Sequence, residues 1–297
     1  MSNIRNFLCS RFGKNGKILE IDYSQLEIYV LAHLSGDATL KSDLLSGKDL
    51  HSISAKMLFG NKFTPKQRKI AKSLSFQLQY GAGYKSMALQ NGISEGLAKR
   101  FIDNYYNRYP GVKMYQDKLA KVVERNREQS SLRTKKGLPA GISKFQSETG
   151  RIYTFIEDDA PEWMHRPAGR GPAKHTTFSP TKIKNYQVQG YATGDIVPMA
   201  IGRLFRELCK YNMEYDGKPV FFINTVHDSV VFDCKNMKHA INWAIRAKEI
   251  MEGIPKDMKK YLNVDFSMPL KVDVEIGSNW NDMTEIDMDK ALALGPP

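Results

Sequence analysis

The sequence contains few cysteines and no long apolar run. Its three cysteines, Cys9, Cys209 and Cys234, lie far apart and form no CxxC pair. This spacing argues against a zinc site or a disulfide framework and favours a reducing, cytoplasmic setting. No apolar run reaches the ~20 residues of a membrane span, and the N-terminus lacks the apolar core of a secretory signal. Internal repeats and low-complexity tracts are also missing.

Acidic residues are outnumbered by basic ones. There are 32 acidic and 44 basic residues, which gives a formal net charge of +12. Such a balance favours phosphate-rich partners over acidic protein surfaces or metabolites. The chain has 297 residues, of which 41% are hydrophobic and 26% charged. These values are typical of a globular chain with one large or two modest domains.

Two aspartates lie at the ends of strand-like segments. Asp22 directly follows the strand-like run at residues 18–21, and Asp228 lies between two apolar runs much later in the chain. Two carboxylates at strand ends are typical of sites that hold divalent cations for phosphoryl chemistry on an anionic substrate. The alternative is that each aspartate only ends a strand or lies in a turn.

A helix between the two aspartates carries cations and aromatics at regular spacing. It begins with a capping threonine, a proline and a glutamine at residues 64–67, and we expect it to end at Gly81. Four side chains recur every fourth residue along it: Arg68, Lys72, Phe76 and Tyr80. Each step drifts by ~40° around a helix, so the four share one broad face. The cations lie nearest the N-terminus, where free N–H groups also favour an anion. Alternatively, this is a solvated basic stripe with its aromatics in the core.

The order of expected elements predicts an α+β fold. Strand-like runs lie near both ends of the chain, and helical periodicity dominates between them. We expect helices at residues 25–34, where Ser24 and Glu27 have capping-box spacing, and at 49–59, 94–109 and 112–122. Another helix should start at residue 182 and be kinked by Pro198. Residues 133–181 should be mostly a basic loop, with a short hairpin near 151–156. A hairpin centred on residues 227–228, a helix through 241–245 and a last strand at 270–276 complete the pattern.

Three segments together resemble the family A, polymerase I-like, DNA polymerases. Residues 22–27, D-Y-S-Q-L-E, are similar to that family's motif A. The helix with Arg68 and Lys72 is similar to motif B, and the pair His227-Asp228 to motif C. Their order and spacing agree with the family, and the resemblance extends from about residue 4 to about residue 280.

The resemblance implies an antiparallel-sheet palm with a large inserted helical fingers subdomain. Residues 1–40 would form the first part of the palm, 41–181 the fingers with a basic loop at 133–181, and 182–297 the second part of the palm. The chain would then be the C-terminal palm and fingers portion of a phage-type member, without thumb or exonuclease. We therefore expect a second polypeptide that supplies both, or a truncated gene product. An apolar patch near residues 7–12 should then receive the absent part of the palm.

The resemblance also assigns roles to individual residues. Template-directed DNA synthesis on a primer-template, with transfer from a dNTP to a primer 3′-OH, would use two Mg²⁺ ions, with Mn²⁺ as a substitute. The implied metal ligands are Asp22, Asp228 and the carbonyl of Tyr23, and the catalytic residues are Asp22, Asp228 and Lys72. The implied dNTP-binding residues are Arg68, Lys72, Phe76, Tyr80, Glu27 and His51. The implied DNA-binding residues are Gln25, Arg151, Asn185, Gln189 and His227.

Motif C departs from the family at one position. Ser229 stands where the family has a glutamate after the aspartate, so we expect altered metal affinity. Two other patterns suggest sites but fit less well. Asp273-Val274-Glu275 has the spacing of a nuclease motif but falls on the expected last strand, and His165 and His175 have no third metal ligand spaced with them.

The sequence also bears on three other functions. A reverse transcriptase is disfavoured because no YxDD sequence occurs, and a single-subunit RNA polymerase because Glu27 and Phe76 match the deoxy-selective pattern. A non-catalytic subunit that binds primer-template stays open as the alternative function, because Ser229 replaces a carboxylate.

Overall fold

The computed structural model describes residues 4–165, 174–215, 217–288 and 290. The chain separates into two compact units. The first unit combines both ends of the chain, Met1–Glu27 and Gly190–Pro297, and the second is the intervening Ile28–Gln189.

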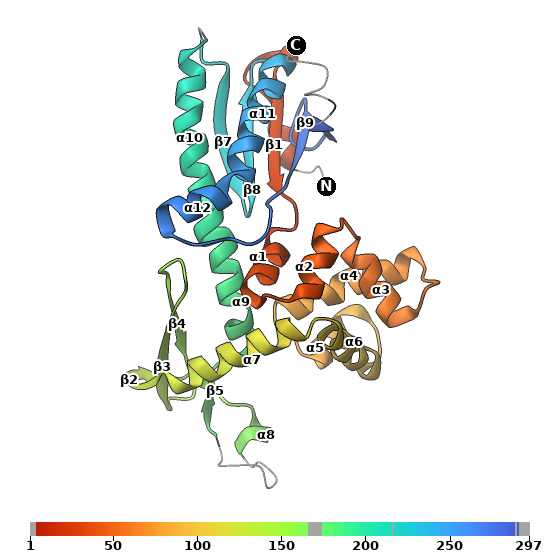
Figure 1. The fold of residues 1–297 in the computed structure, drawn as a ribbon, viewed down its shortest axis with the longest axis vertical. Coiled ribbons are helices and arrows are strands. Elements are labelled where there is room, and N and C mark those ends of the chain that lie inside the picture. The colour runs from red at the N-terminus through yellow and green to blue at the C-terminus, as the bar shows by residue number, and fades with distance from the viewer. Residues whose placement is uncertain (1–3, 166–173, 216, 289, 291–297) are drawn as a thin grey trace. The chain divides into compact units, whose positions relative to one another are not determined.

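The first unit is built on an antiparallel sheet, which has five strands within the described residues (Figure 1). The strand order is β10-β9-β1-β8-β7. The strands are β1 (Lys17–Tyr23), β7 (Val220–Val226), β8 (Ser229–Cys234), β9 (Val272–Gly277) and β10 (Met283–Glu285). The central strand β1 therefore comes from the N-terminal end and pairs on both sides with C-terminal strands. The expected hairpin at residues 227–228 is confirmed, whereas β10 lies beyond the strand that we expected to be last.

Alternation along β1 gives the sheet two different faces. Leu19, Ile21 and Tyr23 are buried on the face covered by helix α11 (Met237–Glu252), and Tyr23 donates a hydrogen bond to the Met251 carbonyl at 2.8 Å. The opposite face carries Glu20 and Asp22, as the two-residue period of a strand requires. Helices α10 (Val197–Met213) and α12 (Ile254–Leu262) also belong to this unit.

The expected kink at Pro198 takes a specific form. The five residues before α10, Ala192–Ile196, form a π-helical segment, and Pro198 lies in the first turn of α10. Proline has no N–H for the carbonyl four residues earlier, and its ring crowds that carbonyl. A wider turn relieves the crowding without ending the helix.

The second unit is mainly helical, and several of its helices start at side-chain caps. Its helices are α1 (Leu26–Ser35, whose first residues belong to the other unit), α2 (Ala38–Leu45), α3 (Leu50–Phe59), α4 (Pro65–Gln79), α5 (Tyr84–Asn91), α6 (Glu95–Arg108), α7 (Pro110–Arg125), α8 (Glu162–His165) and most of α9 (Pro180–Tyr191). The expected cap is confirmed at Thr64, which forms a capping box with Gln67, and Ser94 caps α6. Gly81 follows α4 with a φ of 76°, as the end signal predicted.

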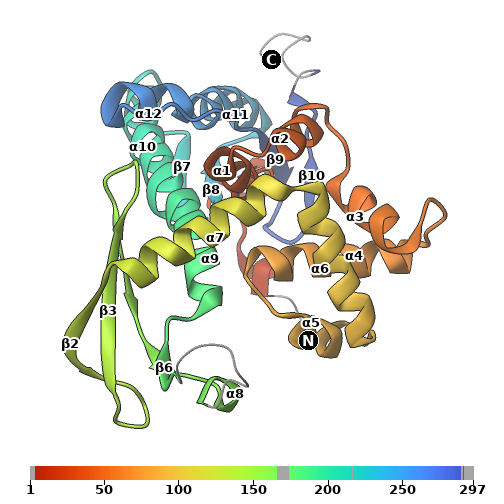
Figure 2. The ribbon, with the colours of Figure 1, turned by 60° about the horizontal axis from the view of Figure 1, so that its bottom comes forward.

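The prediction that residues 133–181 are mostly loop is wrong. Within the part of the chain that the structure describes, β2 (Arg127–Arg133), β3 (Pro139–Gln146) and β4 (Ile152–Ile156) form an antiparallel sheet of three strands (Figure 2). Tyr153 and Phe155 pack with Leu119 and Val123 of α7 in one apolar cluster. Glu157 accepts hydrogen bonds from the Gly141 N–H and from the Arg127 side chain. These contacts are distant in sequence, so the polar composition of the strands concealed them.

Candidate active site

Strand pairing in the first unit brings the two predicted aspartates together. Asp22 lies opposite Ser229 in the β1–β8 ladder, so the turn residue Asp228 is next to it. Their carboxyls are close enough to share a hydrogen bond. The alternative that each aspartate only ends its own strand does not account for this contact. The pair is a site that only the folded chain creates.

The neighbours of Asp22 make its ionisation costly. Partial burial, then the negative charges of Asp228 and Glu20, raise its pKa from the usual 3.8 to about 7. Burial also raises the pKa of Asp228, against the opposing effects of its own backbone N–H, the Asp22 hydrogen bond and the charge of His227. Two carboxyls within hydrogen-bonding reach of each other favour a shared proton or a bound cation over two free negative charges.

Glu20 is a member of this acidic face that the sequence reasoning missed. Its Oε1 accepts from the Ser229 hydroxyl at 2.8 Å, and its Oε2 accepts from the Trp280 indole N–H at 2.7 Å. The signal was available in the strand period, because Glu20 lies two residues before Asp22 and so shares its face. The two hydrogen-bond donors to Glu20 come from segments distant in sequence, so no local sequence pattern predicts these contacts.

The turn from β1 into α1 holds further predicted residues. The Ser24 hydroxyl donates a hydrogen bond to Asp273 Oδ2 on β9 at 2.9 Å. The sequence spacing predicts a different partner for Ser24, a capping box with Glu27. Asp273 belongs to the sequence 273–275, which lies on β9 as expected. Gln25 and His227 are both exposed and have positive φ values, 54° and 55°, in two sharp turns of this unit.

The motif B side chains form a cluster in the second unit. The buried face of α4 consists of Ala71, Leu74, Ser75 and Leu78. Lys72 and Phe76 are exposed instead, and the Lys72 ammonium lies 5.7 Å from the Phe76 ring centroid. The His51 ring of α3 lies 5.5 Å from the same ring, centroid to centroid. Phe76 is therefore not a core aromatic, which argues against the alternative for this residue.

Neighbouring charges and hydrogen bonds set the protonation states of Asp49 and His51 in this cluster. Arg68 donates from Nη2 to Asp49 at 2.6 Å, and Asp49 also caps α3. Although burial acts against it, hydrogen bonds from Ser52 and Arg68 lower the pKa of Asp49 to about 2. Burial, followed by the charge of Lys72, lowers the pKa of His51, which leaves this ring neutral near pH 7. Asp49 is a second residue that we did not predict, although its capping position was readable.

The remaining predicted residues lie on several elements. Tyr80 is the C-cap residue of α4, and Glu27 is in the first turn of α1. Arg151 is exposed directly before β4, and Asn185 and Gln189 are half-buried on α9. The structure places Asp22 and Asp228 in one unit, and the motif B side chains in the other.

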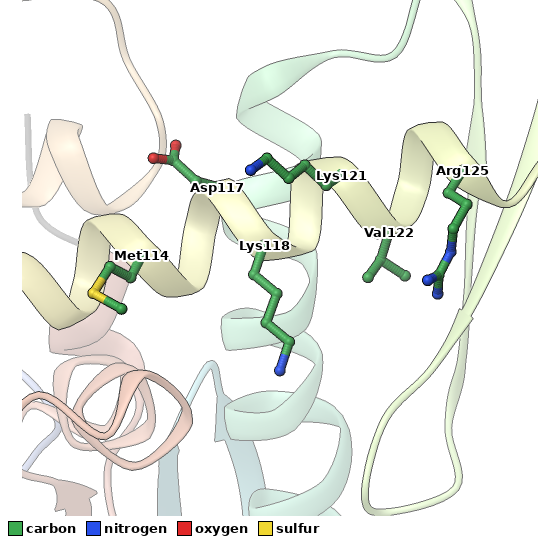
Figure 3. A pocket seen from close by; sticks show the side chains of 6 residues that line it. All are labelled: Met114, Asp117, Lys118, Lys121, Val122 and Arg125. Carbon is green, nitrogen blue, oxygen red and sulfur yellow. The ribbon is translucent and has the colours of Figure 1, made fainter.

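An open hollow on α7 adds positive charge to the second unit. It encloses about 580 Å³ and is lined by Met114, Asp117, Lys118, Lys121, Val122 and Arg125 (Figure 3). Asp117 is paired with Lys113 at 2.7 Å. Three cations therefore dominate a hollow to which the sequence analysis assigned no role.

A metal ion would have few protein ligands here. In the described ranges, no three or more histidine, cysteine or acidic side chains are grouped as a metal site. The rings of His165 and His175 lie 4.9 Å apart, centroid to centroid, but they remain a pair. None of the helices in the part of the chain that the structure describes is long and apolar enough to cross a bilayer.

Comparison with known proteins identifies the family. The model of DNA polymerase family A matches residues 1–282. The chain belongs to DNA polymerase family A. The predicted family resemblance is thereby confirmed over nearly the whole chain.

The similar proteins are polymerases that are much longer than this chain. DNA polymerase I of Chloroflexus aurantiacus is 26% identical over 276 residues, which are 92% of this chain and 25% of that protein. The thermostable DNA polymerase I of Thermus aquaticus is 28% identical over 267 residues, 89% of this chain and 27% of that protein. DNA polymerase of Mycobacterium phage D29 is 43% identical over 108 residues, 36% of this chain and 18% of that protein.

A solved polymerase structure shows the same fold. The polymerase domain of Pol1 from M. smegmatis, in complex with DNA primer-template and dNTP, aligns with a TM-score of 0.64 and 23% identity. The alignment covers 94% of this chain and 42% of that one. The predicted α+β class is confirmed. The chain spans about a quarter of the length of the first two curated relatives.

Proposed function

We propose that this chain is the catalytic palm and fingers portion of a DNA-directed DNA polymerase, which transfers nucleotides from dNTPs to a primer 3′-OH. The observation that carries the proposal is the Asp22–Asp228 pair, joined by β1 and β8 in a family A chain. The basic excess of the chain, +12, suits an anionic primer-template.

The residues at this pair fit Mg²⁺, with Mn²⁺ as a substitute. The donor set consists of hard carboxylate oxygens, and the two carboxyls are close enough to hydrogen-bond to each other. Asp22, Asp228 and the Tyr23 carbonyl would hold two ions, and substrate phosphate oxygens would complete the coordination. When bound, such ions lower the pKa of the attacking hydroxyl and neutralise charge on the leaving pyrophosphate.

The protein's own residues would divide the remaining work. Arg68 and Lys72 bind the triphosphate, and Lys72 also balances charge as pyrophosphate leaves. Neutral His51 donates to a triphosphate oxygen, and Phe76 contacts the incoming sugar and base. Tyr80 lies near the templating base, and Glu27 excludes a ribose 2′-hydroxyl. The residues assigned to DNA contact are Gln25, Arg151, Asn185, Gln189 and His227.

The test uses primer extension together with a DNA-binding assay. Asp22→Ala and Asp228→Ala should each reduce incorporation by orders of magnitude and leave duplex binding nearly unchanged, because each removes one half of the pair. Glu275→Gln on β9 is the matched control and should keep its activity. Near-normal turnover by Asp228→Ala would contradict the two-metal assignment. Salt-dependent DNA binding without any incorporation by the unchanged chain would favour the non-catalytic subunit.

We also propose that a second polypeptide supplies thumb and exonuclease functions. One observation supports it: Ile4, Phe7 and Leu8, near β1 in sequence, are exposed apolar side chains that a partner could cover. Phe12, also expected in this patch, is half-buried against Phe221. The chain alone should then extend primers weakly and distributively, and co-expression with the partner should give processive synthesis. Processive, salt-tolerant synthesis by the 297-residue chain alone would refute it.

A further inference from the structure

Glu20 is held more firmly than a surface carboxylate on a strand needs to be. Each of its oxygens accepts a hydrogen bond from a different side chain, Ser229 at 2.8 Å and Trp280 at 2.7 Å. Both donors are buried, with 4% and 8% of their surface exposed. The carboxylate is therefore fixed in orientation as well as in place.

The position of this carboxylate relative to the aspartate pair is informative. Glu20 and Asp22 share one face of β1, and Ser229 lies opposite Asp22 and directly follows Asp228. Ser229 is the residue at which motif C departs from the family, because a serine replaces the glutamate. Through its hydroxyl, Ser229 contacts the Glu20 carboxylate. A negative charge thus lies beside position 229, although residue 229 does not carry it.

We propose that Glu20 is a positioning residue that supplies, from β1, the charge that a glutamate at position 229 would supply from β8. This inference rests on the proposed function, because it concerns the same site. With both oxygens occupied by donors, Glu20 acts through its fixed charge beside Asp22 and Asp228 and not as a ligand. Such outer carboxylates tune how tightly inner ligands hold a cation.

The competing explanation is purely structural. Glu20 would then serve only to accept hydrogen bonds from Ser229 and Trp280. Glu20→Gln separates the two explanations, since an amide of the same shape keeps an acceptor for Trp280 and removes the charge. Glu275→Gln is the matched control, because Glu275 lies opposite Glu20 on β9 and is exposed.

The experiment measures Mn²⁺ binding to the whole chain by electron paramagnetic resonance, without DNA or dNTP. Glu20→Gln should weaken Mn²⁺ binding by about 10-fold or more, the usual effect of losing an outer-shell carboxylate. The exchange variant Glu20→Ser with Ser229→Glu should recover most of the binding that Glu20→Ser loses. The Mg²⁺ concentration for half-maximal primer extension should change in the same order, and thermal unfolding in EDTA checks that each variant folds.

The outcomes separate this inference from the proposed function. If Asp22→Ala leaves Mn²⁺ binding unchanged, or if the unchanged chain binds none, the proposed function fails and the inference fails with it. If Asp22→Ala abolishes binding while Glu20→Gln binds like the unchanged chain, the inference alone is overturned. An exchange variant no better than Glu20→Ser would also overturn it. Rescue by the exchange variant supports the transfer of charge between strands.

Discussion

The aspartate pair should lower the stability of the metal-free protein at neutral and alkaline pH. The pKa of Asp22 rises from 3.8 to about 7 because of burial, Asp228, Glu20 and Asp273. At about 1.4 kcal/mol per pH unit, the full shift corresponds to about 4 kcal/mol. The Asp22 carboxyl is partly buried, but the residue as a whole is exposed, so solvent screening reduces the expected cost to about 1–2 kcal/mol.

The sign follows from proton binding in the two states. Between pH 3.8 and about 7, the unfolded chain releases the Asp22 proton while the folded chain retains it. Folding stability therefore falls as the pH rises through this window, and the loss is complete above about pH 7. Asp22→Asn removes the charge and should escape this loss.

Urea denaturation in EDTA tests the reasoning. At about pH 8, Asp22→Asn should be more stable than the unchanged chain by about 1–2 kcal/mol, and at about pH 4 the difference should nearly vanish. Adding Mg²⁺ at the higher pH should stabilise the unchanged chain more than the variant. Asp103→Asn, which removes a charge from α6, should show neither effect. If Asp22→Asn is no more stable than the unchanged chain at the higher pH, burial and the neighbouring carboxylates do not make the ionisation of Asp22 costly as described.

Three further predictions concern the helical unit. Lys72→Ala should lower kcat/KM for dNTPs by about 10- to 100-fold with little change in DNA binding, since a charge-assisted contact is lost. Lys69→Ala on the same helix is the control and should have little effect; equal losses of kcat/KM for the two variants in single-turnover assays would contradict the assignment. Phe76→Tyr should ease dideoxynucleotide incorporation because a hydroxyl can replace the missing 3′-OH contact, and unchanged discrimination in competition assays would place Phe76 away from the sugar. Gly81→Ala should destabilise the chain by more than about 1 kcal/mol in urea melts, because the φ of Gly81 is 76° and an added Cβ would lie 2.9 Å from a backbone atom of α9. Gly83→Ala is the control, because an added Cβ there meets open space.

Local signals predicted the elements that local interactions start or end. The capping box at Thr64, the turn at residues 227–228 and the positive-φ Gly81 all depend on neighbours in sequence. The meeting of Asp22 with Asp228 was predicted through resemblance and is seen in the structure. The roles assigned to these residues stay predictions.

What the sequence concealed depends on contacts between distant residues. The β2–β4 sheet is stabilised by the packing of Tyr153 and Phe155 on α7, which no window of the polar sequence reveals. Glu20 looked like the polar half of an alternating strand, because its donor Trp280 lies at the other end of the chain. Contacts with residues distant in sequence, and not local propensity, determine both the β2–β4 sheet and the hydrogen bonds of Glu20.

The strand order of the first unit has a consequence for protein synthesis. β1 is made early, but its partners β8 and β9 leave the ribosome only after the whole of Ile28–Gln189. Until then, β1 has two unpaired edges, which favour pairing with other chains. A nascent chain that stops before residue 228 carries half of the aspartate pair and a strand without its partners. Efficient production should therefore depend on how quickly translation reaches the codons of β8 and β9, and synonymous slow codons before β8 should raise the insoluble fraction.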